Sequence, residues 1–106
     1  MARRAARQDS NHGDVVKALV GAGCVCTNTH MVGSGFPDIC VGFRNDQGHP
    51  RIILIEVKDG SKVPSKQKLT EDEQRWWNHW PGDAYVVRSA REAVELVFDL
   101  RLTPRG

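Results

Sequence analysis

The chain has few cysteines, no long apolar run and almost no net charge, and each shortage excludes a class of protein. Its three cysteines are an odd number that cannot all pair within one chain, which disfavours a secreted disulfide scaffold and favours a reducing compartment. No apolar stretch is long enough to cross a bilayer, and no apolar core follows the basic first residues as it would in a secretory signal. We therefore expect an intracellular protein with no membrane partner.

The charge balance is too even to identify a partner. Lys and Arg number 15 against 13 for Asp and Glu, so contacts with nucleic acid would have to come from local clusters of basic residues. With 106 residues the chain is long enough for one core that needs neither disulfides nor metal. We predict a single domain over 1–106, with its core at about 11–100 and a basic arm at 1–10.

Three cysteines and one histidine are possible zinc ligands: Cys24, Cys26, Cys40 and His30. The Cys-x-Cys spacing of the first pair is not that of the usual zinc fingers, and it places both thiols on one face of a strand. Free cysteine is also among the most buried residue types. We therefore favour buried apolar thiols over a zinc site.

The strongest structural signal is an apolar run at 51–58 that ends in two charges. Side chains of a strand alternate between its faces, so Glu56 and Lys58 share one face. Apolar residues precede them on both faces, with Ile52 and Leu54 on one and Ile53, Ile55 and Val57 on the other. The pattern predicts a central strand covered on both sides, with the acid and the base together at its end, where α/β sheets usually hold their sites.

Turn, cap and periodicity signals place the other elements around this strand. Helices are predicted at about 11–20, 70–80 and 89–100, and strands at 24–28, 38–43, 51–58 and 84–88. The first helix has Asn11 or Ser10 as its cap, and the later two begin with the capping boxes Thr70-x-x-Glu73 and Ser89-x-x-Glu92. The resulting order αβββαβα predicts an α/β fold.

Three charged residues that are distant in sequence are expected to meet. A hairpin turn at 44–50 joins the strand at 38–43 to the central strand, and antiparallel pairing brings the start of the first strand to the end of the second. Asp38 should therefore lie beside Glu56 and Lys58. A lone Glu-x-Lys on a strand is usually a solvated pair, but the convergence with Asp38 at a buried edge favours a catalytic site.

These residues resemble a known nuclease signature. Pro37-Asp38, a hairpin and then Glu56-Val57-Lys58 have the form of the PD-(D/E)xK motif. Over about 11–100 the chain is similar to the virus-type replication-repair nuclease (VRR-NUC) domain of that superfamily, through Gly35-Phe36-Pro37-Asp38, Lys68-Leu69-Thr70, Gln74 and Tyr85-Val86-Val87-Arg88-Ser89. The resemblance implies a restriction-endonuclease-like core, in which helices flank a central mixed sheet.

The resemblance also implies the chemistry. Asp38, Glu56 and the backbone carbonyl of Val57 would hold Mg²⁺, or Mn²⁺ as a substitute, because hard cations prefer oxygen ligands. Lys58 would position or deprotonate the attacking water, or stabilise the developing oxyanion. Gln74 would orient the lysine, the water or a phosphate, although its position alone fits an exposed helix amide. No small-molecule cofactor is expected.

One position departs from the family pattern. Many relatives complete the metal shell with a glutamate in the first helix, and this chain has His12 there. The resemblance implies that His12 ligates the metal, or that Asp14 takes over this role. A surface histidine near a helix start is an equally good interpretation of His12.

Basic residues cluster after the central strand. Lys62, Lys66 and Lys68 lie in a loop at 59–69 that would follow a phosphate backbone. Further candidates for DNA contacts are Arg44 and Arg51 beside the hairpin turn, Arg3, Arg4 and Arg7 in the arm, and Ser34 between two glycines.

Three tryptophans lie on the helix after this loop. Aromatic residues at helical spacing are usually core, so we expect at least two of them to pack, with Trp76 and Trp80 on one face. Trp77 is the candidate for stacking on an unpaired base or for a contact with a second subunit.

The resemblance predicts a metal-dependent, structure-selective DNA endonuclease of phage type, in the cytoplasm of a bacterium or a phage-infected host. Small domains of this family tend to be dimers, and a symmetric homodimer would make paired cuts in four-way (Holliday) junctions. The alternatives are a flap or branched-DNA nuclease and a catalytically inactive DNA-binding module. Cleavage of a specific sequence is disfavoured because no further domain remains to read bases.

Overall fold

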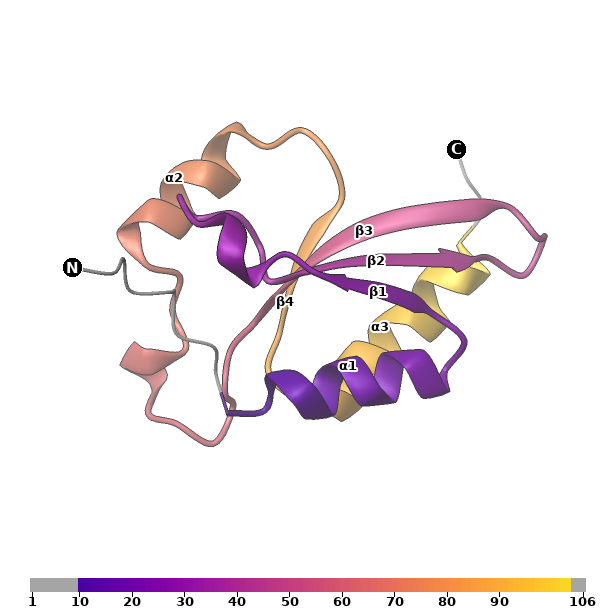
Figure 1. Cartoon of the computed structure of the whole chain (residues 1–106), viewed down its shortest axis with the longest axis horizontal. Helices are drawn as coiled ribbons and strands as arrows, with labels where there is room; N and C mark the ends of the chain where they lie inside the picture. The colour runs from indigo at the N-terminus through magenta and orange to yellow at the C-terminus, as the bar shows by residue number, and fades with distance from the viewer. Residues whose placement is uncertain (1–9, 104–106) are drawn as a thin grey trace.

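The computed structural model describes residues 10–103, which form an α/β fold with the predicted order αβββαβα (Figure 1). The strands are β1 (Val25–Asn28), β2 (Ile39–Arg44), β3 (Pro50–Val57) and β4 (Ala84–Val87). The helices are α1 (His12–Gly21), α2 (Glu71–His79) and α3 (Ala90–Leu102), with the short 3₁₀ helices η1 (His30–Val32) and η2 (Pro64–Lys66). None of the helices within 10–103 has the length and apolarity to cross a membrane. All of the predicted basic arm except Ser10 lies outside the described residues.

The four strands form one mixed sheet in the order β1-β2-β3-β4. β1, β2 and β3 pair antiparallel, and β4 pairs parallel with β3. The register places Ile39 opposite Ile55, and the N–H of Asp38 donates to the carbonyl of Ile55 at 3.0 Å. Asp38 therefore lies next to the end of β3, as the predicted hairpin requires.

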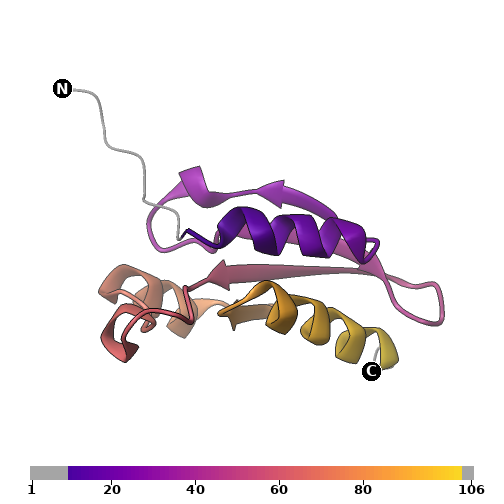
Figure 2. The same cartoon turned by 90° about the horizontal axis from the view of Figure 1, so that it is seen from below.

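The core lies between one face of the sheet and the helices α1 and α3, which lie side by side on that face (Figure 2). The side chains that fill it are fully buried: Val15, Leu19, Ile39, Val41, Ile53, Ile55 and Val97. The alternation of β3 explains the layer, because every second residue of the strand faces the helices. This layer fixes the position of the strand that carries Glu56 and Lys58.

The opposite face of β3 is covered only over its second half. Ile52 is 69% exposed, whereas Leu54, Glu56 and Lys58 on the same face are buried. The expectation that both faces are covered along the whole strand is therefore wrong at Ile52. The physical reason is that α2 lies at the end of the sheet opposite the β2–β3 hairpin and leaves the hairpin half uncovered (Figure 1).

Asn11 occupies the N-cap of α1, but its side chain makes no capping hydrogen bond. Its amide instead donates to the carbonyls of Lys58 and Arg88, each at 3.1 Å. The prediction of a side-chain cap is wrong because these two carbonyls, at the ends of β3 and β4, take up the amide. The contact fixes the start of α1 next to the end of the central strand.

The two predicted capping boxes have different outcomes. At α2 the box is complete, because Thr70 Oγ1 accepts from the N–H of Glu73 and Glu73 Oε1 accepts from the N–H of Thr70. At α3 Ser89 accepts from the N–H of Glu92, but the Glu92 carboxylate accepts from the N–H of Arg88. Only one of the two hydrogen bonds predicted for the second box is therefore present.

The three thiols are free, and Cys24 is buried. Burial raises the pKa of Cys24, and it raises the pKa of Cys26 to about 11. No disulfide or ready zinc group involves these cysteines within the described part of the chain. The prediction of buried thiols is therefore confirmed at Cys24 and wrong at Cys26 and Cys40, which are only partly buried.

Two of the tryptophans pack as expected. Trp76 and Trp80 stack with ring centroids 4.8 Å apart, and the ring of Phe36 lies edge-on to both, at 5.4 and 6.4 Å. Trp77 is half-buried, and its indole nitrogen has no hydrogen-bond partner among residues 10–103. Its stacking on a base or contact with a second subunit stays a prediction.

Candidate active site

A cleft of about 420 Å³ opens where β3 ends and β2 begins. Four segments contribute to its wall: the loop before β2, the end of β3, the loop that follows it, and the start of α2. Its polar lining residues include His30, Ser34, Asp38, Glu56, Lys58, Lys66, Thr70, Asp72 and Glu73. The three residues predicted to converge are therefore in one cavity.

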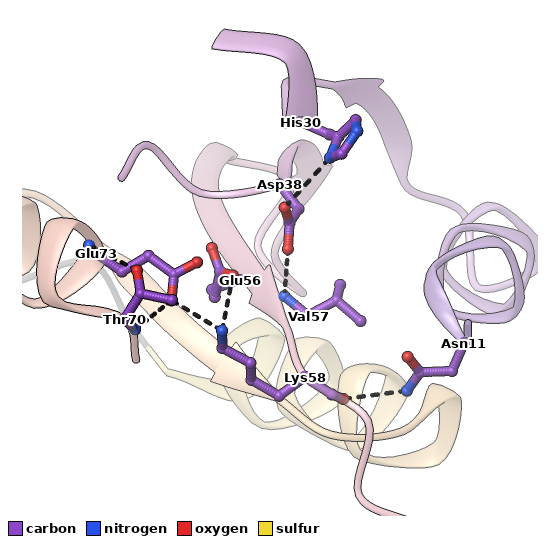
Figure 3. A network of polar contacts seen from close by, with 8 residues as sticks. All are labelled: Asn11, His30, Asp38, Glu56, Val57, Lys58, Thr70 and Glu73. Carbon is purple, nitrogen blue, oxygen red and sulfur yellow. Dashed lines mark hydrogen bonds and ion pairs between the residues drawn. The ribbon is translucent and has the colours of Figure 1, made fainter. Parts of the chain in front are cut away.

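Asp38, the residue before β2, is held in place by hydrogen bonds. Its carboxylate accepts the N–H of Val57 at 2.8 Å (Figure 3). Its backbone bonds to Ile55 on one side and to Thr29 on the other. Burial raises the pKa of Asp38 above the ordinary aspartate value, although the bond from Val57 acts against this rise. The backbone thus orients the carboxylate toward the end of β3.

Glu56 is the most buried carboxyl group of the cleft, with 3% of the residue exposed. Its Oε2 lies 3.6 Å from Lys58 Nζ, and its Oε1 is buried without a hydrogen-bond partner among the described residues. Burial, followed by the negative charge of Asp38, raises the pKa of Glu56 to about 10. A carboxyl group in this environment binds a proton at neutral pH unless another cation replaces that proton.

Lys58 contacts a residue that the sequence-based reasoning assigned only to a helix cap. Its Nζ lies 2.8 Å from Glu73 Oε1, closer than to Glu56 Oε2 at 3.6 Å (Figure 3). Burial acts to raise the pKa of Glu73, but hydrogen bonds from Lys58, from Glu56 and from the N–H of Thr70 outweigh it and leave the pKa lowered. In the sequence, the capping box is the feature that could have indicated this contact, because it fixes Glu73 on the turn of α2 nearest the cleft.

Gln74 lies outside this cleft. It is exposed, its amide donates to Asn78 at 2.9 Å, and it lines a different cavity with Lys68 and Arg88. Consecutive helix residues are about 100° apart around the axis, so Glu73 and Gln74 cannot both face the site. The structure brings Glu73 to Lys58, where the resemblance had suggested Gln74.

Two histidines lie near Asp38. His30 Nδ1 is 4.0 Å from Asp38 Oδ1, and the ring of His12 lies 6.3 Å from that of His30. His12 is 6% exposed, so the interpretation as a surface histidine is wrong. The physical reason is that the hydrogen bond from the Asn11 amide to the Lys58 carbonyl holds the start of α1 against the sheet. Asp14 is exposed and lines another cavity. His12 also lines a cavity outside this cleft, but of the two candidates it is the one whose charge acts on Asp38.

The predicted DNA-contact residues divide into two groups. Ser34 and Lys66 line the cleft, and Lys62 and Lys68 are exposed on the same loop as Lys66. Arg44 lies at the far end of β2, about 20 Å of extended strand from Asp38, where its guanidinium donates to the carbonyl of Gly48. Arg44 therefore belongs to the hairpin end and not to the cleft.

The loop that carries Ser34 is fixed by a close approach between two backbones. Gly35 has φ +84°, and a Cβ atom there would lie 2.3 Å from the carbonyl oxygen of Asp72 in α2. Only glycine fits this position, because a side chain would displace the first turn of α2. Ser34 has φ +57° beside it, a conformation that costs a non-glycine residue free energy.

We expect Gly35→Ala to lower the free energy of unfolding by about 3 kcal/mol, through left-handed strain and the forced movement of α2. Gly48→Ala is the matched control, because Gly48 has φ +82° and open space around it. Its expected cost is only about 1 kcal/mol. Urea unfolding of both variants measures the difference, and equal costs would contradict the close approach.

The arrangement is not a preassembled metal site. Within residues 10–103, no three His, Cys, Asp or Glu side chains form a ready metal-binding group. The donors nevertheless suit a hard cation, because Asp38 and Glu56 supply carboxylate oxygens and Glu56 Oε1 has no hydrogen-bond partner in the described chain. The N–H and carbonyl of a strand residue point to the same neighbour, so the Val57 carbonyl faces the Asp38 side.

Comparison with known proteins gives no match. Models of known families, curated proteins and solved structures were compared with the chain, and none is similar to it. The VRR-NUC resemblance thus stays a prediction from the motif residues.

Proposed function

We propose that the protein is a divalent-metal-dependent nuclease that hydrolyses phosphodiester bonds of DNA. The observation that carries this proposal is the buried carboxyl pair of Asp38 and Glu56 beside the Lys58 ammonium in one open cleft. With Asp72 and Glu73 the cleft has four carboxyl groups against the two ammonium groups of Lys58 and Lys66, so it has an excess of acidic groups that a divalent cation would balance. Mg²⁺, with Mn²⁺ as a substitute, is the cation that such oxygen donors favour.

The residues of the cleft divide the chemistry among them. A bound divalent cation supplies charge neutralisation and activation of water. Asp38 and Glu56 hold it, and the bond from Val57 orients Asp38. The Lys58 ammonium lies 2.8 Å from Glu73 Oε1 and 3.6 Å from Glu56 Oε2, so it is held at the wall of the cleft. Of the roles left open for Lys58, stabilising the negative charge that develops on the phosphate fits this setting best.

The surroundings of the cleft support a polyanionic substrate. Lys66 is in its wall, and Lys62 and Lys68 are exposed on the loop that leaves the end of β3. Such lysines would bind a phosphate backbone without reading its sequence. Contacts with the phosphate backbone favour selection of DNA by its shape, so the four-way junction is our first candidate substrate, cut by a homodimer. Flap and other branched DNA are the next candidates.

The proposal is tested with labelled four-way, flap, nicked and linear duplex DNA, each with Mg²⁺, with Mn²⁺ and with chelator. We expect product only in the presence of metal, and more from the branched substrates than from linear duplex. Absence of metal-dependent product from every substrate would overturn the nuclease proposal. Salt-sensitive DNA binding without cleavage would then support the inactive binding module.

His12→Ala tests the assignment of the first helix. If the imidazole completes the metal shell, we expect Mn²⁺ affinity to fall by about 10- to 100-fold. Titration calorimetry measures the affinity, and melting shows whether the variant is folded. Asp14→Ala is the control, since Asp14 is exposed outside the cleft and should leave the affinity unchanged. Unchanged affinity in a folded His12→Ala variant would remove His12 from the site.

A further inference from the structure

We propose that Glu73 is the positioning residue for Lys58, which it holds in the cleft through its charge. This inference rests on the proposed nuclease function and adds a residue to its machinery. Glu73 does not contact the bond to be cleaved. It acts through the lysine, so its effect should appear in turnover and not in the stability of the helix.

The contact itself is short and shielded from solvent. Lys58 Nζ lies 2.8 Å from Glu73 Oε1 and 3.6 Å from Glu56 Oε2, so Glu73 is the nearer of the two carboxylates. The side chain of Glu73 is 17% exposed and that of Lys58 is 8% exposed. At this burial an ion pair is screened little by water and by salt, so it can hold a flexible lysine in one position.

The backbone fixes Glu73 before it meets the lysine. Glu73 Oε1 also accepts the N–H of Thr70 at 2.8 Å, and Thr70 Oγ1 accepts the N–H of Glu73 at 3.2 Å. The first turn of α2 is further held by the loop at Gly35, which passes against the carbonyl of Asp72. The carboxylate is therefore preorganised, and Lys58 loses its side-chain freedom against a rigid partner.

A comparison within the chain separates this role from capping. Glu92 on α3 is also a capping residue, and its carboxylate accepts the N–H of Arg88 at 2.9 Å. Its side chain is 46% exposed, and its ion pair with Arg88 is long, at 3.9 Å. A capping glutamate thus needs no short buried ion pair. Capping of α2 therefore does not explain the short contact between Glu73 and Lys58.

Glutamine distinguishes the two roles, because it can replace glutamate in a capping box but carries no charge. We expect Glu73→Gln to melt above Glu73→Ala, because it keeps the capping bonds of α2, and to lower kcat by about 10- to 100-fold with little change in KM. Glu73→Ala should show the same loss of kcat and a lower melting temperature. Glu92→Gln, which removes the comparable charge from α3, should keep the full kcat.

A second measurement does not depend on cleavage. We expect the ion pair to slow the exchange of the Lys58 ammonium protons with water, so that their signal is detected in ¹⁵N-edited NMR of the metal-free protein. This signal should be lost in Glu73→Gln but kept in Glu92→Gln. Full kcat and an unchanged Lys58 signal in Glu73→Gln would overturn the inference. If the wild-type chain cleaves no DNA, the nuclease proposal fails separately, and a lost Lys58 signal would still support the positioning contact.

Discussion

In metal-free buffer at neutral pH, the Glu56→Gln variant is expected to be more stable than the wild-type chain, although it should have lost DNA cleavage. Glutamine keeps the shape of the side chain and removes its ability to ionise. In the wild type, Glu56 is 3% exposed beside Asp38 and Glu73, so its negative charge would be buried among like charges. At neutral pH the folded chain avoids this buried charge only by taking up a proton, and glutamine removes that cost.

The raised pKa of Glu56 determines whether the stability of the folded chain rises or falls with pH. Burial and the charge of Asp38 raise the pKa of Glu56 to about 10 in the folded chain, whereas an unfolded glutamate has a pKa of about 4.3. Between these values the folded chain keeps a proton that the unfolded chain has lost, so the stability of the wild type falls as the pH rises. The advantage of Glu56→Gln should therefore be small near pH 4.5 and should grow toward pH 8.

We expect the advantage at pH 8 to be about 2 kcal/mol, which corresponds to an increase in melting temperature of roughly 10 °C for a domain of this size. Adding Mg²⁺ should stabilise the wild type and leave the variant unchanged, because the variant has lost a ligand. Cleavage should fall on the order of 10³-fold, the several kcal/mol that a bound cation supplies. A variant that melts below the wild type at pH 8 without metal would contradict this account of Glu56.

The part of the site on β2 and β3 was predictable because it follows from short-range rules. Side-chain alternation places Glu56 and Lys58 on one face, and one hairpin brings Asp38 to them. Both rules depend only on the backbone geometry of neighbouring strands. The order of the elements was predictable for the same reason, since caps and turn residues act within a few positions.

The contacts made by α1 and α2 were not predictable in the same way. Asn11 and Glu73 both occupy capping positions, and their further bonds, to the carbonyls at the strand ends and to Lys58, depend on where the helices pack. One step along a helix turns the side chain by about 100°. Glu73 therefore lines the cleft, whereas its neighbour Gln74 lines another cavity.

Replacing Lys58 should have the opposite effect on stability from replacing Glu56. Lys58→Met keeps the apolar part of the side chain and removes the ammonium, so Glu56 and Glu73 lose the cation that lies between them. Removing one partner of a buried ion pair leaves uncompensated charge, which we expect to cost about 3 kcal/mol in metal-free buffer. Cleavage should fall on the order of 10³-fold, as for removal of a group that stabilises transition-state charge.

Lys17→Met is the control for loss of one positive charge, since Lys17 is exposed on α1 and its replacement should change stability by less than about 0.5 kcal/mol. The double variant Lys58→Met with Glu73→Gln tests the cause, because it removes the cation together with its nearest carboxylate. Urea unfolding should show most of the lost stability restored, while cleavage stays absent. If the double variant were as unstable as Lys58→Met alone, the cost would come from lost packing, and the cleft would not be organised by the balance of its charges.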